Sequence, residues 1–194
     1  TAAARGIEVI PTGVLSLDLA LGVGGYPCGR VIEIFGDSEA GKTTLTLHGL
    51  VQAQRLGFEA SYIDVEKALD YAYAERIGVD LDSLAISEPE DGADALRVAS
   101  ASLQAGARYV VLDSVAALTT EAERADLMAK SMGAQARLMS QGLRNLINDA
   151  RAVNAVLVLI NQTRSKIGVV YGSPRTTTGG NALKFYASER IDLT

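Results

Sequence analysis

Four short runs of the chain are almost continuously apolar and rich in β-branched residues. Runs of this length without alternation are typical of strands covered on both faces, as in a parallel sheet. Between them lie segments in which apolar residues recur every three or four positions, the spacing of an amphipathic helix. The runs are residues 31–35, 60–63, 109–112 and 155–160, and the helical segments are 43–56, 93–105 and 133–153. This alternation predicts an α/β fold with a central, mostly parallel sheet flanked by helices.

The end of the chain has a different pattern. Residues 187–193 alternate, with Ser188, Arg190 and Asp192 on one side and mainly apolar residues on the other. Such alternation predicts an exposed strand near the sheet edge, although Glu189 on the apolar side weakens the pattern. Residues 163–180 are glycine-dense, and we expect an irregular, mobile stretch there. No internal repeat or low-complexity linker divides the chain, so we expect one domain over residues 1–194.

Composition narrows the possible functions. The 194 residues are 48% hydrophobic and carry a formal net charge of −5, which excludes a globally basic nucleic-acid binder but not a local basic loop. A single cysteine, Cys28, and a single histidine, His48, exclude a disulfide framework and a His-based metal cluster. The apolar runs are too short to span a membrane, and the first residues lack the apolar core of a secretory signal. We therefore expect a cytoplasmic protein without membrane partners.

The strongest motif follows the first apolar run. Residues 36–43 read Gly-Asp-Ser-Glu-Ala-Gly-Lys-Thr, which matches the P-loop pattern, with a predicted strand before it and a helix after it. Glycines let backbone N–H groups converge on phosphate oxygens, and the following helix N-terminus adds partial positive charge. Lys42 is expected to reach the β- and γ-phosphates and the Thr43 hydroxyl to bind Mg²⁺. The predicted nucleotide contacts are Gly36, Asp37, Ser38, Glu39, Ala40, Gly41, Lys42, Thr43 and Thr44.

Two of these loop residues, Asp37 and Glu39, are acidic and unfavourable beside a polyanion. We expect them to point away from the phosphates or to act on Mg²⁺ or water. A further carboxylate, Asp113, ends the apolar run 109–112. In P-loop proteins a carboxylate at this position holds Mg²⁺, although a strand-ending Asp also often caps the next helix. With the P-loop upstream, we predict that Asp113 and Thr43 together hold the metal.

Two other predicted strands end in polar residues at the same edge of the sheet. Residues 61–66 end with Asp64 and Glu66, and Gln162 follows the apolar run 155–160. We predict that Glu66 orients or deprotonates the water that attacks the γ-phosphate, with Asp64 as its rival and helix capping as the alternative for both. We predict that Gln162 contacts the γ-phosphate and relays its loss to the next loop; a simple hydrogen bond at the strand end is the alternative.

Taken together, these residues resemble the RecA family of bacterial recombinases along nearly the whole chain. The resemblance is carried by residues 11–22, 36–43, 62–66, 68–70, 112–118, 139–141, 160–162 and 176–188. It implies a RecA-type P-loop ATPase core that uses ATP and ADP with Mg²⁺. It assigns catalysis to Lys42, Glu66 and Gln162 and the metal to Thr43 and Asp113. It further implies that Asp70 and Tyr73 contact adenine, with the Tyr73 ring stacked on the base.

The resemblance also implies binding of single-stranded DNA by two loops, at about residues 119–132 and 163–180. Residues 161–190 contain five Lys or Arg and one acidic residue, a net charge of +4 that suits phosphate contacts. On charge alone, a solvated surface loop is the alternative. The residues that the resemblance places against DNA are Arg137, Ser140, Arg144, Arg164, Ile167, Gly179, Gly180 and Asn181.

The chain departs from the family pattern in ways that affect the expected activity. It begins where the family's core begins, without the N-terminal helix and strand that pack on the neighbouring subunit. It stops at Thr194, before the remaining core strands, the lysines that reach the neighbour's ATP and the C-terminal domain. The first loop lacks the usual glycine-rich acidic pattern, and Arg175 stands where Glu is usual. We therefore expect a monomer that hydrolyses ATP very slowly and binds DNA weakly, with self-assembly a property of the full-length parent.

The predicted function is the ATPase core of a DNA recombinase, acting in strand exchange, DNA repair and the SOS response to DNA damage. Two alternatives remain open at this point. One is a catalytically idle nucleotide-binding module derived from such a core. The other is a different DNA motor of the RecA superfamily, such as a replicative helicase, against which the Thr-Thr-Thr-Gly-Gly-Asn sequence at 176–181 argues.

Overall fold

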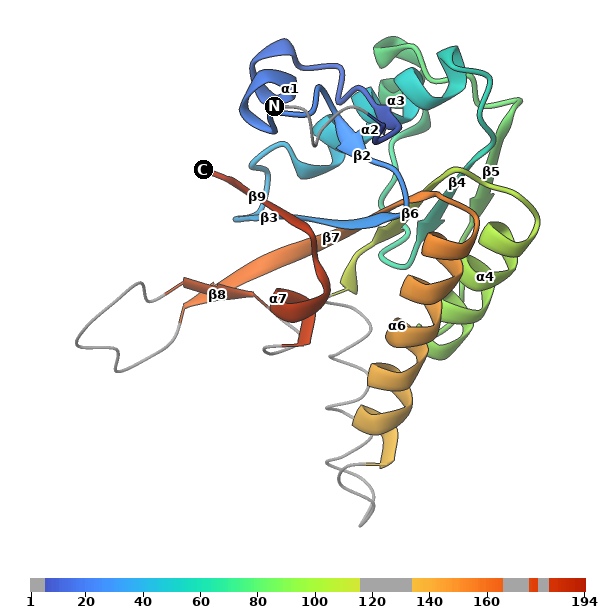
Figure 1. The fold of residues 1–194 in the computed structure, drawn as a ribbon. Helices are drawn as coiled ribbons and strands as arrows, with labels where there is room; N and C mark the ends of the chain where they lie inside the picture. The colour runs from blue at the N-terminus through green and yellow to red at the C-terminus, as the bar shows by residue number, and fades with distance from the viewer. Residues whose placement is uncertain (1–5, 116–133, 166–174, 178–181) are drawn as a thin grey trace.

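The predicted parallel sheet is present in a computed structural model, which describes residues 6–115, 134–165, 175–177 and 182–194. Six strands lie in the order β5-β4-β6-β7-β3-β9, and every neighbouring pair is parallel (Figure 1). Their bounds are β3 Arg30–Gly36, β4 Ala60–Asp64, β5 Leu84–Ser87, β6 Tyr109–Asp113, β7 Val156–Ser165 and β9 Glu189–Leu193. The predicted fold class is confirmed. Because the strands are parallel, their carboxyl ends meet along one edge of the sheet, where ligands bind in open α/β folds.

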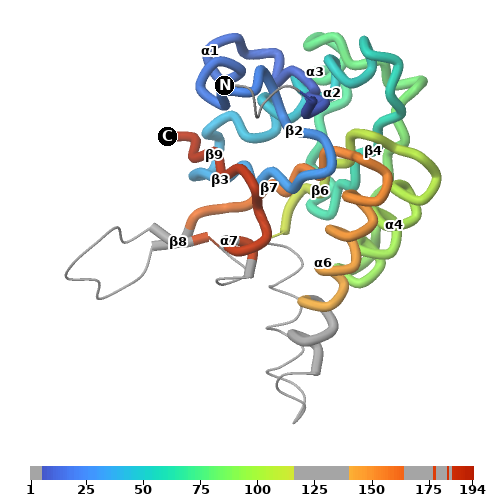
Figure 2. The backbone as a smooth tube through the Cα atoms, viewed as in Figure 1, coloured from blue at the N-terminus to red at the C-terminus, as the bar shows by residue number. Residues whose placement is uncertain are grey.

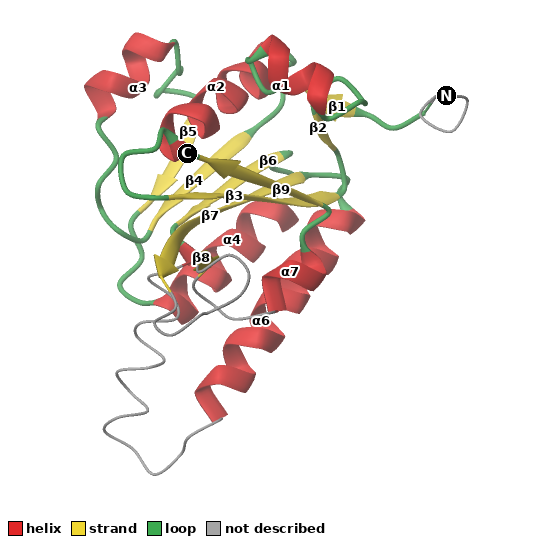
Figure 3. Ribbon diagram, turned by 90° about the vertical axis from the view of Figure 1, so that its left-hand side faces the viewer, coloured by secondary structure: helices red, strands yellow, loops and turns green. Residues whose placement is uncertain are grey.

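Helices cover both faces of this sheet (Figure 3). On one face lie α1 (Leu15–Ala20), α2 (Lys42–Arg55) and α3 (Tyr71–Ile77), and on the other α4 (Gly92–Gln104), α6 (Ala134–Ala152) and α7 (Ala182–Tyr186). Each face has its own apolar core, and the strand residues alternate between the two: Ile32, Ile34 and Val111 join the first, and Val110 and Leu112 the second. Burial on both sides explains why these strands read as continuous apolar runs.

The longest helices begin and end within a residue or two of the predicted bounds, whereas several short elements were not predicted. These are the antiparallel pair β1 (Val9–Ile10) and β2 (Tyr26–Pro27), the helices α1, α3 and α7, and the strand β5. Each spans seven residues or fewer, too short for a clear hydrophobic period. Helix α1 has no fully buried residue: Leu17 packs against the core while only partly buried, and Leu15 and Leu19 are exposed.

The two predictions for the C-terminal third have different outcomes. Strand β9 lies at the sheet edge with alternating exposure, as predicted. The prediction of an irregular stretch over 163–180 is wrong at its described positions, because the end of β7 pairs antiparallel with β8 (Arg175–Thr177), Thr163 opposite Thr177. This ladder projects from the sheet. Figure 2 also shows α6 beside α4, the two helices that cover the same face of the sheet. Residues 166–174 and 178–181, and the predicted loop at 119–132, lie outside the described residues.

None of the helices in the described part of the chain has the length and apolarity needed to cross a bilayer.

Candidate nucleotide-binding site

The loop between β3 and α2 has the geometry of an anion site. Gly36 closes β3, and a Cβ atom there would lie 2.4 Å from the carbonyl oxygen of Leu193, so no larger residue fits. Gly41 is the N-cap of α2 and has a left-handed φ of 90°, which favours glycine. No N-cap side chain accepts a hydrogen bond from the first turn of this 14-residue helix. Its N-terminal N–H groups and its dipole therefore suit a phosphate.

Lys42 lies at the bottom of this loop and is buried. Its Nζ donates hydrogen bonds to the carbonyl oxygens of Gly36, at 3.3 Å, and Asp37, at 2.5 Å. The adjoining pocket has a volume of about 170 Å³ and is lined by Glu39, Gly41, Lys42, Thr43 and Thr44. Lys42 is the only cationic side chain among these lining residues. The loop thus supplies one ammonium group and a helix N-terminus to a shared pocket, the donor set that a phosphate chain requires.

The acidic residues of the loop have different surroundings. The Asp37 carboxylate is exposed and accepts a hydrogen bond from the Thr163 hydroxyl, so it joins the loop to β7. Glu39 has a φ of 62° and lines the phosphate pocket. Ser38 is exposed, and Ala40 lines a second pocket described below. The Asp37 carboxylate is therefore bound to β7, whereas Glu39 lies at the pocket that was expected to hold the phosphates.

The predicted metal residues meet across two elements. The Thr43 hydroxyl donates to Asp113 Oδ2 at 3.4 Å, and the Tyr62 hydroxyl donates to the same oxygen at 2.6 Å. Burial raises the pKa of Asp113 from its ordinary 3.8 to about 6; the Tyr62 hydrogen bond opposes this rise, whereas the charge of Glu66 adds to it. Asp113 ends β6 beside the P-loop helix, so the structure brings the two residues together as the sequence predicted.

Thr43 and Asp113 suit Mg²⁺, whose remaining ligands can be phosphate oxygens and water, better than they suit a metal ion with protein ligands only. Among the described residues, no group of three or more His, Cys, Asp or Glu side chains lies close enough to hold an ion. Mg²⁺ commonly takes one or two carboxylates and completes its shell with phosphate oxygens and water. One carboxylate and one hydroxyl beside a phosphate pocket match that preference.

Glu66 and Gln162, which come from different strands, also lie together. Glu66 is exposed, and its Oε1 accepts hydrogen bonds from the Ser114 hydroxyl and from Gln162 Nε2, the latter at 3.0 Å. Asp64, the rival for the catalytic role, is buried and its Oδ2 accepts from the Leu69 N–H at 2.9 Å. Asp64 therefore shapes the turn after β4, and Glu66 is the carboxylate left to face a ligand.

The predicted adenine contacts lie at the start of α3. Asp70 is the N-cap of this helix, and its side chain accepts from the Tyr73 N–H at 2.9 Å. The Tyr73 hydroxyl lies 3.0 Å from Thr44 Oγ1, and the Arg76 guanidinium stacks over the Tyr73 ring at 5.7 Å. Tyr73 is thus within reach of the phosphate loop. Its stacking on adenine stays a prediction.

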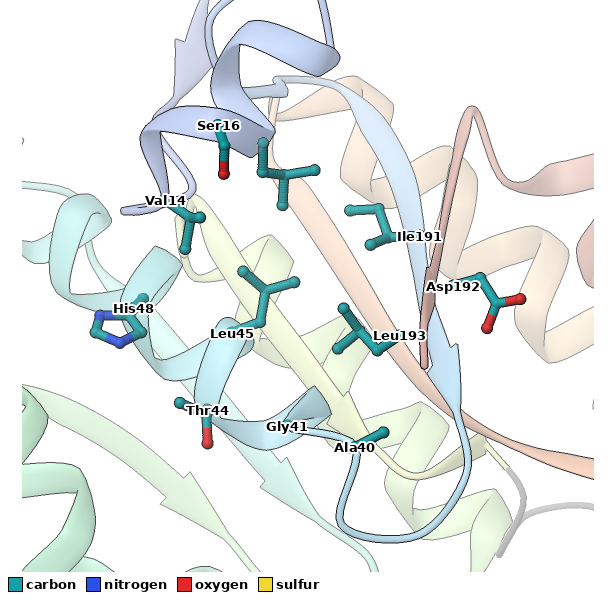
Figure 4. Close-up of a pocket in the computed structure, with 11 residues that line it drawn as sticks. Val14, Ser16, Ala40, Gly41, Thr44, Leu45, His48, Ile191, Asp192 and Leu193 are labelled. Atoms are coloured by element: carbon teal, nitrogen blue, oxygen red, sulfur yellow. The ribbon is translucent and has the colours of Figure 1, made fainter.

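A second, larger pocket of about 550 Å³ adjoins the loop (Figure 4). Figure 4 shows it between α1, the first turns of α2 and the end of β9, with His48 at its side. It is lined by Val14, Ser16, Leu17, Ala40, Gly41, Thr44, Leu45, His48, Ile191, Asp192 and Leu193. Gly41 and Thr44 belong to both pockets, so this mostly apolar space continues the phosphate site on the side away from Asp113.

Sequence reasoning missed several residues that build the site. Glu33, in the middle of β3, is completely buried and accepts hydrogen bonds from Asn161 Nδ2, at 2.9 Å, and Arg190 Nε, at 2.5 Å. Asn161 Oδ1 in turn accepts from the Gln162 N–H at 2.9 Å. A charged residue inside an apolar run was the available signal, since a buried charge needs partners. Tyr62 gave a weaker signal of the same kind, a hydroxyl inside a buried strand.

The residues predicted to bind DNA are only partly described. Ser140 and Arg144 lie on α6, and Arg144 is exposed. For Arg137 on α6 and Arg164 on β7, only the backbone placement is described. Ile167, Gly179, Gly180 and Asn181 lie outside the described residues.

The sheet order, the phosphate loop and the carboxylates at the strand ends define a RecA-type P-loop α/β core. The chain belongs to the RecA family, because the family model described as the RecA N-terminal domain matches residues 1–194. It is 55% identical over 194 residues to Protein RecA of Methylococcus capsulatus, an alignment that covers 99% of this chain and 56% of that protein. It is 53% identical over 189 residues to Protein RecA of Haemophilus ducreyi, covering 96% and 51%. The chain therefore spans about half the length of these curated relatives.

Proposed function

We propose that this chain binds ATP and ADP with Mg²⁺ and hydrolyses ATP, as the ATPase core of a DNA recombinase. The observation that carries this proposal is the convergence of three strand ends on one phosphate loop. Lys42 lies in the pocket, Thr43 contacts Asp113, and Glu66 contacts Gln162. Membership of the RecA family supports recombination and DNA repair as the setting, with a role in the SOS response as part of the proposal. A cytoplasmic location stays a prediction.

Each residue has a distinct part in the proposed reaction. Lys42 and the first N–H groups of α2 bind the phosphate chain, and Thr43 and Asp113 hold Mg²⁺. Mg²⁺, when bound, neutralises charge that develops on the β- and γ-phosphates. Glu66 accepts a proton from the attacking water at Oε1 or Oε2, and the Gln162 amide orients Glu66 before the γ-phosphate arrives. Loss of the γ-phosphate would then change the contacts of Gln162. Gln162 lies on β7, directly before the residues that pair with β8, so such a change could be passed to β8.

We propose that turnover is slow in this chain. Among the described residues, Lys42 is the only cationic side chain that lines the phosphate pocket, whereas fast phosphoryl transfer usually uses a further cation. Such a cation contributes on the order of 10³-fold or more to the rate.

Substitution of Glu66 by Gln tests the proposed chemistry. Glu66 is exposed, so the variant should fold normally and bind ADP with Mg²⁺ like the parent. Loss of a positioned general base lowers rates by about 100-fold or more, so single-turnover hydrolysis of ATP should fall by that factor. Equal hydrolysis by Glu66→Gln and the parent would exclude Glu66 as the base. Tight nucleotide binding without hydrolysis in either protein would favour the idle binding module.

We also propose weak binding of single-stranded DNA through the basic C-terminal third and α6. Arg144 is exposed on α6, and Arg151 is exposed near the other end of the same helix. Arg144→Ala should weaken binding of a fluorescent oligothymidine severalfold and reduce its salt dependence, as expected for one lost phosphate contact, whereas Arg151→Ala should not. Equal effects of the two substitutions in an anisotropy titration would show that α6 acts only through its general charge.

A further inference from the structure

Tyr62 contacts the predicted magnesium ligand from the neighbouring strand. It lies in the middle of β4, opposite Val111 of β6, and its side chain is completely buried. Its hydroxyl donates a 2.6 Å hydrogen bond to Asp113 Oδ2. The Thr43 hydroxyl reaches the same oxygen at the longer distance of 3.4 Å. The short contact of Asp113 is therefore with a residue to which sequence reasoning gave no role.

The geometry gives the two hydroxyls different parts. Thr43 is itself a predicted metal ligand, so its contact with Asp113 has to change when a cation lies between them. Tyr62 approaches Asp113 from the apolar core between the sheet and α2. Its ring packs in that core, and the hydroxyl at the end of the ring contacts the carboxylate. Both donated hydrogen bonds go to Oδ2, so Oδ1 accepts neither of them. A donor on one oxygen fixes the plane of the carboxylate and leaves the other oxygen for a cation.

We propose that Tyr62 is a positioning residue for the magnesium site, acting by holding Asp113 in the orientation that binds Mg²⁺. This inference rests on the proposed nucleotide function. Residues that hydrogen-bond metal ligands from behind commonly contribute 10- to 100-fold to metal affinity, because they remove the freedom of the ligand before the metal binds. Tyr62 has this relation to Asp113, whereas it is not among the residues that line either of the two pockets.

The test is the Mg²⁺ dependence of ADP binding in Tyr62→Phe, measured by calorimetry over a series of MgCl₂ concentrations and in EDTA. Removal of the hydroxyl leaves the ring in the core. The half-saturating Mg²⁺ concentration should rise about tenfold. ADP binding in EDTA should stay within about twofold of the parent, because Lys42 and the loop N–H groups are unchanged.

A matched control is available one strand away. Tyr109 on β6 is also completely buried, and its hydroxyl donates to the carbonyl oxygen of Thr46 in α2 at 3.1 Å. Tyr109→Phe therefore removes a comparable buried hydroxyl on the same side of the sheet without touching Asp113. Its Mg²⁺ dependence should equal that of the parent. A second comparison uses Asp113→Asn, in which the added change Tyr62→Phe should have no further effect on Mg²⁺ dependence.

The outcomes separate this inference from the proposed function. An unchanged Mg²⁺ requirement in Tyr62→Phe would overturn the inference alone, and so would equal shifts in Tyr62→Phe and Tyr109→Phe. A tenfold effect that persists in the Asp113→Asn background would also overturn it, because Tyr62 would then act through another residue. Absence of ADP binding by the parent protein would overturn the proposed function, and the role of Tyr62 with it.

Discussion

Two clusters of side chains in the sheet surround a carboxylate with different partners. The Asp113 cluster consists of Thr43, Tyr62 and Asp113, and both partners of the acid are neutral hydroxyls. The Glu33 cluster consists of Glu33, Asn161, Gln162 and Arg190, and its acid has a guanidinium partner as well as an amide. Asp113 therefore has no cation of its own in its described contacts, whereas Glu33 has one.

We infer from this difference that the partners of an acid inside the fold indicate its role. A carboxylate held by neutral donors keeps a negative charge that an arriving cation can balance, which suits a metal ligand. A carboxylate paired with Arg is already balanced, and such a pair serves to fix the structure around it. In the Glu33 cluster the residue held in place is Asn161, whose Oδ1 accepts from the Gln162 N–H, and the Gln162 side chain in turn donates to Glu66.

The largest predicted effect comes from breaking the charge pair of the Glu33 cluster. Arg190→Met would leave the carboxylate of Glu33, which has no exposed surface, without its cation. Loss of one partner of a buried pair costs 3–5 kcal/mol, and since the Arg190 side chain is 30% exposed we expect about 3 kcal/mol of unfolding free energy. Urea unfolding of the parent and of Arg190→Met measures this difference in unfolding free energy.

The control for that substitution is an exposed pair on α4. Arg97 contacts Asp94 with 76% of its side chain exposed, so Arg97→Met should change the unfolding free energy by less than about 0.5 kcal/mol. If Arg190→Met were equally mild, the Glu33 cluster would not be the balanced structural pair described above.

A smaller effect is expected from neutralising the acid of the Asp113 cluster. In the folded protein the pKa of Asp113 is about 6, above its ordinary 3.8, mainly because of burial. The folded state then binds a proton more tightly than the unfolded state, so Asp113 lowers stability progressively as pH rises from about 4 to 6, with no further loss above. One pKa unit is worth about 1.4 kcal/mol, so this loss reaches about 2 kcal/mol when partial solvent access is allowed for.

Asp113→Asn removes this titration. Without nucleotide or metal, the variant should therefore be more stable than the parent at pH 7.5, with a difference that shrinks toward pH 4.5. Thermal unfolding of both proteins across this range measures the difference, and other titrating groups cancel in the comparison. A difference that does not vary with pH would show that burial does not raise the pKa of Asp113 in the free protein.

The smallest effect on stability is expected at Gln162. Its side chain is exposed, so Gln162→Ala should change the unfolding free energy by less than about 0.5 kcal/mol. Loss of a contact with the γ-phosphate should instead lower the preference for a slowly hydrolysed ATP analogue over ADP by about fivefold, the value of one hydrogen bond. An unchanged preference in competition binding would leave Gln162 as an ordinary hydrogen-bonding residue at a strand end.

The sequence was most informative where local chemistry is strict. The P-loop requires glycines, lysine and a hydroxyl at fixed spacing, and the parallel strands require continuous apolar runs, so both could be located before the fold was known. The position of Asp113 beside Thr43 could also be predicted, because parallel strands bring their carboxyl ends together.

The residues that could not be predicted depend on pairing across the sheet. Glu33 and Arg190 are 157 positions apart in the chain and meet only because β9 lies beside β3. Tyr62 and Asp113 meet because β4 lies beside β6. Strand order is a tertiary property, so spacing along the chain does not reveal these contacts. The different surroundings of Asp64 and Glu66 were similarly hidden from the sequence, since they depend on the backbone turn that brings the Leu69 N–H to Asp64.

The most direct test of the central claim is calorimetric titration with ADP and Mg²⁺ of the parent, Lys42→Ala and Arg55→Ala, the last an exposed control in the final turn of the same helix. The phosphate-loop account predicts saturable binding by the parent and by Arg55→Ala. It predicts affinity at least about 30-fold weaker for Lys42→Ala, since a charge-assisted contact to phosphate is worth about 2 kcal/mol or more. No binding by the parent, or equal binding by all three proteins, would contradict it.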